Sequence, residues 1–306
     1  MIVVFLTGLV SVMIFRQLWQ LYEVTQGLTL RTAWWWSIPA VLIGVLGAMI
    51  AGLADAHQPA IADAFLDLTA IAALAPFVAI LGARRPGAAA WPWFVVLPML
   101  IVLSWPTMSQ VMGSDLTRSL APCVPAAFGI LLVTVMGTGN YFGSGNTSAF
   151  FSSAVAVSLL TSRHFGFHWR SDLQFLASGL LLMAALQFAC RRIANLRHMP
   201  CGTQLERMNR TWFLFRDLYG IVWARRVMDR VNQFAVREKW QLRLSLDGFE
   251  PHPDNPGKID HPELDRPTEI FVWILRRFAS TDWIAQHLNV IVTNPANASA
   301  SGTSQT

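Results

Sequence analysis

Seven long apolar runs constrain this chain most, because about 20 consecutive apolar residues are enough to cross a bilayer. The runs cover residues 2–21, 33–54, 61–83, 91–108, 120–136, 148–161 and 173–190. Charge is divided in the same way: residues 1–190 contain seven Arg, no Lys and six acidic residues, whereas residues 191–306 contain sixteen basic and twelve acidic residues. The sequence therefore predicts an all-α polytopic membrane protein with about seven transmembrane helices.

The composition excludes several other classes of protein. Hydrophobic residues make up 54% of the chain and charged residues only 13%, whereas an average soluble domain has about 25% charged residues. A disordered chain, a coiled coil and an ordinary soluble enzyme are all excluded by this balance. The net charge of +5 comes mainly from Arg, and a basic membrane protein usually carries that charge in inward-facing loops. We therefore expect no nucleic-acid partner.

The arginine distribution predicts the direction of the spans. With the N-terminus outside, seven arginines near the membrane are cytoplasmic and three are external, which is the bias that the positive-inside rule requires. The inner set is Arg16, Arg31, Arg84, Arg85, Arg191, Arg192 and Arg197, and the outer set is Arg118, Arg163 and Arg170. We expect a multi-pass protein of the bacterial inner (cytoplasmic) membrane with its C-terminus inside. The run at 148–161 is short and Ser-rich, and without it six spans would remain and the last would reverse.

After the last apolar run, residues 191–292 are expected to form a small, mostly helical cytoplasmic domain, and residues 293–306 a disordered tail. Residues 205–240 place apolar and basic side chains at helical spacing, as one long amphipathic helix or as two that meet at Gly220. Such a helix either lies on anionic lipid or packs inside the domain. The residues expected to contact lipid or a partner are Arg207, Arg210, Arg225, Arg226, Trp212 and Trp223. A short strand at 242–247 and a helix at 269–278, with Thr268 as its N-cap, are expected to follow.

Ionisable residues near the outer membrane surface form the candidate metal site. Asp63 and Asp67 are four residues apart and so share one face of the third span. The predicted topology places His57, His164 and His168 on the same side of the membrane. Carboxylate and imidazole together suit a transition metal or Zn²⁺, and a His pair four residues apart also suits haem. The alternative is that these are interfacial residues, and we expect the histidines to lie far from both acids.

Two further sequence patterns predict features of the structure. The glycine-rich segment 137–148 lacks the Lys and the preceding strand of a phosphate-binding loop, so we expect a flexible connection between two spans. The second span has small residues at helical spacing, which allow a neighbouring helix to approach closely. They are Ala40, Gly44, Ala48, Gly52 and Ala56. We expect this row to pack inside the bundle, with a dimer interface as the alternative.

No catalytic arrangement of residues is evident, and an enzyme is therefore not expected. The sequence predicts a non-catalytic integral membrane component, such as an assembly, scaffold or accessory subunit, whose basic cytoplasmic domain contacts a partner or anionic lipid. Its expected partners are the lipid bilayer and other membrane subunits, in an oligomeric state that the sequence does not specify. The alternative function is the handling or transport of a solute, a metal or haem through the outer Asp and His residues.

Overall fold

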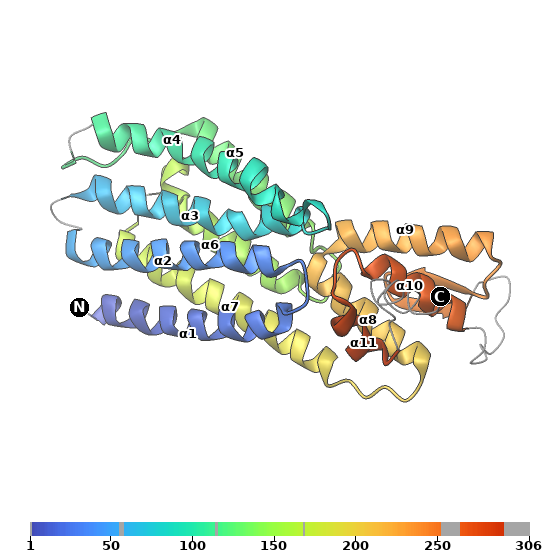
Figure 1. Ribbon diagram of the computed structural model, residues 1–306. Coiled ribbons are helices and arrows are strands. Elements are labelled where there is room, and N and C mark those ends of the chain that lie inside the picture. The colour runs from blue at the N-terminus through green and yellow to red at the C-terminus, as the bar shows by residue number, and fades with distance from the viewer. Residues whose placement is uncertain (1, 55–57, 114–115, 168, 252–263, 291–306) are drawn as a thin grey trace, which may run out of the picture.

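The computed structural model describes residues 2–54, 58–113, 116–167, 169–251 and 264–290. Within these residues, seven apolar helices form a bundle. They run side by side, and a smaller helical part sits at one end of them (Figure 1). The seven are α1 (Ile2–Thr25), α2 (Arg31–Ala54), α3 (Pro59–Leu81), α4 (Leu97–Gly113), α5 (Val124–Gly139), α6 (Thr147–Leu160) and α7 (Ser171–Arg197). The short turns η1 (Gly87–Ala89) and η2 (Pro92–Val96) lead into α4, and η3 (Ser162–Phe165) follows α6. The all-α class is confirmed.

The lengths of these helices decide which of them can cross a membrane. Among the described residues, five helical stretches are long and apolar enough, namely α1, α2, α3, the stretch 87–113 and α7, whereas α5 and α6 are shorter. The chain is therefore a membrane protein by helix length and composition. Helix α7 has 27 residues, or about 40 Å at 1.5 Å per residue. It extends beyond the apolar run at 173–190 and ends among arginines.

Helix α3 is the central helix of the bundle, because its small side chains let neighbouring helices pack closely. Ala62 and Ala70 are fully buried, and so is Leu74. The row of small residues on α2 is buried only in part: Ala48 is buried, whereas Gly52 is exposed. A Cβ atom added at Gly44 would lie 3.2 Å from the Thr69 methyl group of α3. Ala56, the last residue of that row, lies outside the described residues.

The described residues of the small domain form four helices and one hairpin. They are α8 (Gln204–Tyr219), α9 (Ile221–Arg237), β1 (Leu242–Ser245), β2 (Gly248–Pro251), α10 (Asp265–Leu275) and α11 (Thr281–Leu288). The two strands are antiparallel, with Leu244 opposite Phe249. The amphipathic segment forms two helices rather than one, because Gly220 between them has a φ of +80°. Such a φ favours glycine and ends α8.

Three expectations for this domain need correction. The predicted helix at 269–278 begins earlier, at Asp265, so Thr268 is not an N-cap. Thr268 instead lies inside α10, where its hydroxyl donates to the Leu264 carbonyl at 2.7 Å. The sequence pattern also predicted neither β2 nor α11. The predicted disordered tail at 293–306 lies outside the described residues.

The core of the small domain includes residues from the loops of the bundle. Met208, Trp212, Phe215 and Tyr219 form a buried row on α8. Leu28 and Leu30, from the α1–α2 loop, and Ala83, which follows α3, belong to the same core. Backbone hydrogen bonds reinforce the contact, from Thr29 N to Phe278 O at 2.9 Å and from Arg85 N to Arg277 O at 2.9 Å. We call this end of the bundle the docked end and the opposite end, where the N-terminus lies, the far end (Figure 1).

The glycine-rich segment between α5 and α6 is not a loose connection. Asn140 accepts from Ile221 N at 2.6 Å through its backbone carbonyl and from Val222 N at 3.0 Å through its side chain. Tyr141 donates to the Leu218 carbonyl at 2.8 Å. Burial raises the pKa of the Tyr141 hydroxyl, so the phenol stays protonated and can donate. The glycines allow close approach: a Cβ atom at Gly220 would lie 2.5 Å from the Asn140 carbonyl oxygen. The segment therefore joins the bundle to the small domain.

Candidate functional site: an arginine pocket and a closed ion cluster

Four arginines surround a pocket of about 240 Å³ between the docked end of the bundle and the small domain. Arg84 follows α3, Arg226 and Arg230 lie on α9, and Arg277 follows α10. The other lining residues are Trp223, Val227, Trp273, Ile274 and Phe278. We call this site the arginine pocket. Its floor is apolar and aromatic, while all four arginines are exposed to solvent.

No carboxylate in the described part of the chain pairs with an arginine of the arginine pocket. The ion pairs of the small domain involve Arg192, Arg216, Arg237, Arg243 and Arg266 instead. Three of the pocket arginines lie over aromatic rings. The Arg226 guanidinium is 4.8 Å from the Trp223 ring centre, that of Arg230 is 4.9 Å from the Phe234 ring centre, and that of Arg277 is 5.2 Å from the Trp273 ring centre. Stacking holds the planar cations in place while their N–H groups remain free to donate. This arrangement suits a phosphate or another oxyanion.

The arginine pocket lies level with the docked end of α3. Trp223 Nε1 donates to the carbonyl of Ile80 at 3.1 Å, in the last turn of that helix. Arg84 comes three residues after α3 ends. An anion in this pocket would therefore lie beside the point at which an apolar helix reaches its polar boundary. That is the depth at which lipid headgroups lie around a membrane helix.

The residues that the sequence proposed for lipid or partner contact do not all lie at one site. Arg226 and Trp223 line the arginine pocket, and Arg225 is exposed next to it. Trp212 has no exposed surface and lies in the core of the small domain, which leaves none of it for lipid. Arg210 donates to the carbonyls of Met199 and His287, each at 3.2 Å. Arg207, on the same helix, is partly exposed.

A second charged group, the closed ion cluster, lies at the far end. We use this name for Asp63, Asp67, Thr107, Arg163 and His164. The Asp67 side chain is 1% exposed, and its two carboxylate oxygens accept from three residues. The Arg163 guanidinium donates to both, Thr107 donates to Oδ2 at 2.8 Å, and His164 Nε2 lies 3.0 Å from Oδ1.

The hydrogen bonds of His164 fix its tautomer. Its Nδ1 accepts from Cys123 N at 3.1 Å, so the proton of a neutral ring is on Nε2 and points to Asp67. Both ring nitrogens are thus engaged by the protein, whereas a metal ligand needs one of them free. Asp63 is held in a similar way, because its Oδ2 accepts from Leu120 N at 3.0 Å. Among the described residues, no group of three or more His, Cys, Asp or Glu side chains could hold a metal.

The expectation that the histidines lie far from the acids is wrong for His164, which contacts Asp67 directly. His57 and His168 lie outside the described residues, so the five-residue metal site stays a prediction. The sequence reasoning missed Arg163, which it counted only as an outer-loop charge. The adjacency of Arg163 to His164 was the available signal, since a cation beside a buried carboxylate neutralises it.

Comparison with protein-family models, with curated proteins and with solved structures found no match.

Proposed function

We propose that this protein is a non-catalytic integral membrane component whose cytoplasmic domain binds anionic lipid, and that the arginine pocket is the headgroup site. The observation that carries the proposal is the group of four exposed arginines beside the docked end of α3, which have no carboxylate partner within the described ranges. The oxygens of a phosphate headgroup can accept hydrogen bonds from the N–H groups of these guanidinium groups. Basic residues at such a surface contribute about 1 kcal/mol each to binding an anionic membrane.

The proposed topology has seven spans, with the N-terminus outside and the small domain in the cytoplasm. The arginine bias supports it, and so do the contacts of the α5–α6 segment with α8 and α9. Helices α5 and α6 have 16 and 14 residues, which is about 24 and 21 Å. Because they run as an antiparallel pair, the side on which the small domain lies does not depend on whether both cross fully. The proposed location is a bacterial inner membrane, and other membrane subunits remain proposed partners.

Lipid selectivity of the full-length protein tests the headgroup site. Purified protein in neutral detergent is mixed with dioleoylphosphatidylglycerol or with dioleoylphosphatidylcholine, and bound lipid is counted by native mass spectrometry. We expect preferential retention of phosphatidylglycerol. Replacing Arg226 and Arg230 by Gln should remove about 2 kcal/mol of the attraction, which is roughly a thirtyfold loss of affinity.

A second pair of arginines on α9 provides the matched control. Arg225→Gln with Arg237→Gln removes the same charge from the same helix but leaves the pocket intact, since neither residue lines it. We expect this variant to retain phosphatidylglycerol like the unaltered protein. Equal losses in both variants would show that charge on α9 acts diffusely, and would contradict a headgroup pocket.

A further inference from the structure

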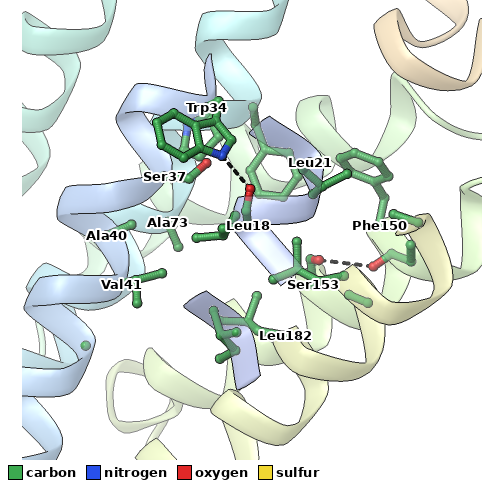
Figure 2. A pocket seen from close by; sticks show the side chains of 18 of the residues that line it. Leu18, Leu21, Trp34, Ser37, Ala40, Val41, Ala73, Phe150, Ser153 and Leu182 are labelled. Atoms are coloured by element: carbon green, nitrogen blue, oxygen red, sulfur yellow. Dashed lines mark hydrogen bonds between the residues drawn. The ribbon is translucent and has the colours of Figure 1, made fainter. Parts of the chain in front are cut away.

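An apolar cavity of about 280 Å³ lies inside the bundle, between α1, α2, α3, α6 and α7 (Figure 2). On α1 its lining residues extend from Thr7 to Thr25, and on α7 from Phe175 to Ile193. Each pair is eighteen residues apart, or about 27 Å along a helix. The cavity is therefore long and narrow, and it follows most of the ~30 Å thickness of a bilayer's hydrocarbon core.

The lining of this cavity suits a hydrocarbon chain. Leu18, Leu21, Val41, Phe150 and Leu182 present aliphatic and aromatic groups to it (Figure 2). Small residues, Ala40 on α2 and Ala73 on α3, keep it open. Protein interiors pack at high density with few voids larger than a water molecule. An apolar cavity of this size stays dry and takes up apolar ligands.

Two polar atoms of the lining have no hydrogen-bond partner among the described residues, namely Ser178 Oγ and Asn146 Oδ1. Ser178 is 2% exposed and Asn146 is 3% exposed. Buried polar atoms in proteins are nearly always paired. Asn146 already donates through Nδ2 to the Asp217 carbonyl at 2.8 Å, so its Oδ1 needs a donor from elsewhere. Asn146 precedes α6 at the docked end. Asp217 also lines the cavity, and its carboxylate is paired with Arg192 and Arg216.

We propose that this cavity binds one neutral single-chain lipid. Its hydrocarbon chain lies along α1 and α7, and a hydroxyl of its headgroup donates to Asn146 Oδ1 at the docked end. An ionised carboxylate headgroup lacks that donor. The site is distinct from the arginine pocket, with which it shares no lining residue. The proposal therefore goes beyond the proposed function and does not depend on it.

Native mass spectrometry of the full-length protein in detergent tests this inference, with 1-monooleoylglycerol and oleate as probes. We expect one monooleoylglycerol per protein, bound about tenfold more tightly than oleate because only the former can satisfy the Asn146 acceptor. Ser153, on α6, lines the cavity, and its hydroxyl donates to Ala149 O at 3.0 Å (Figure 2). Ser153→Phe fills the cavity and should reduce monooleoylglycerol binding at least about tenfold, since the chain loses its apolar site.

Ser158 provides the matched control on the same helix. Its hydroxyl donates to Ala154 O at 2.9 Å, but the residue is exposed and lines no part of the cavity. Ser158→Phe should bind monooleoylglycerol like the unaltered protein. Equal binding by the Ser153→Phe and Ser158→Phe proteins, or equal binding of the two probes, would overturn the proposal. If Ser153→Phe fails to fold by circular dichroism and gel filtration, Ala40→Leu on α2 replaces it with the same expected loss.

Discussion

The closed ion cluster and the arginine pocket, at opposite ends of the bundle, differ in how their charges are paired. At the far end, the Asp67 carboxylate and the Arg163 guanidinium are almost completely buried and satisfy each other. At the docked end, the four arginines of the arginine pocket are exposed and have no acidic partner among the described residues. A buried charge must be paired within the protein, whereas an exposed charge is left free for a ligand. The closed ion cluster is therefore a structural element, and the arginine pocket is the candidate for binding.

The largest expected effect follows from breaking the closed ion cluster. Arg163→Leu leaves the Asp67 carboxylate buried without its cation, which destabilises a protein by about 3–5 kcal/mol. Thermal unfolding in detergent, followed by circular dichroism, measures this loss. The control is Arg243→Leu, which breaks the ion pair of Arg243 with Glu250 across the hairpin. The two side chains are 49% and 37% exposed, so we expect a change of only about 0–1 kcal/mol.

Removing Arg163 together with Asp67 should do less harm than removing Arg163 alone. In Arg163→Leu with Asp67→Leu, the almost completely buried Asp67 carboxylate is removed with its cation, and apolar replacements of buried ion pairs are often neutral or stabilising. The remaining carboxylate of the cluster, Asp63, is less buried, with a side chain that is 14% exposed. We expect the double variant to recover most of the stability lost in Arg163→Leu, when both are measured by the same thermal unfolding. A double variant as unstable as the single one would mean that packing, rather than charge pairing, determines the loss.

Replacing an arginine of the arginine pocket should leave the free energy of unfolding almost unchanged in the same experiment. Arg230→Leu removes an exposed charge whose recorded hydrogen bond goes to Gln233 at 3.0 Å on the surface. The free energy of unfolding should change by no more than about 0.5 kcal/mol, as for most surface substitutions. A loss comparable to that of Arg163→Leu would show that this arginine is structural, and the contrast between the two ends would fail.

The last prediction concerns the side of the membrane on which each end of the bundle lies. Fused reporters test it without changing any charge of the protein. A reporter fused after Thr306 should behave as cytoplasmic, and one inserted at Asp115 as exported, if the two ends lie on opposite sides of the membrane. The arginine bias supports this assignment. Reporter activity in whole cells measures it, and an exported C-terminal reporter would place the arginine pocket outside and contradict the proposed topology.

Much of the fold could be predicted from hydropathy, because an apolar run longer than a bilayer is thick has few alternatives to a membrane helix. Each of the seven predicted runs contains a helix in the structure. The ends were harder to place: α7 continues through Arg191, Arg192 and Arg197, where helical propensity persists although the apolar signal has ended. The antiparallel pairing of Leu242–Ser245 with Gly248–Pro251 was also missed, since the second strand is short and followed by a polar, Pro-rich segment.

Long-range contacts explain why the functional sites were predicted less well. The arginine pocket gathers Arg84, Arg226 and Arg277 from three separate parts of the chain, and no local spacing reveals such a group. The glycine-rich segment was expected to be flexible because its hydrogen-bond partners, on α8 and α9, are about 80 residues away. Asp63 and Asp67 were identified correctly as unusual, but their partner Arg163 is 96 residues beyond Asp67.

The loop between α1 and α2 has a consequence for the order of synthesis. Leu28 and Leu30 belong to the same core as Ile284, yet they leave the ribosome about 250 residues earlier. At about 5–20 residues per second, this part of the core stays incomplete for roughly 13–50 s, until the intervening residues have been synthesised. During that interval the first loop presents two leucines and an unpaired backbone, including the carbonyl of Gly27 that later accepts from Ser280 N at 2.7 Å. A chaperone that shields this loop would therefore act before translation ends.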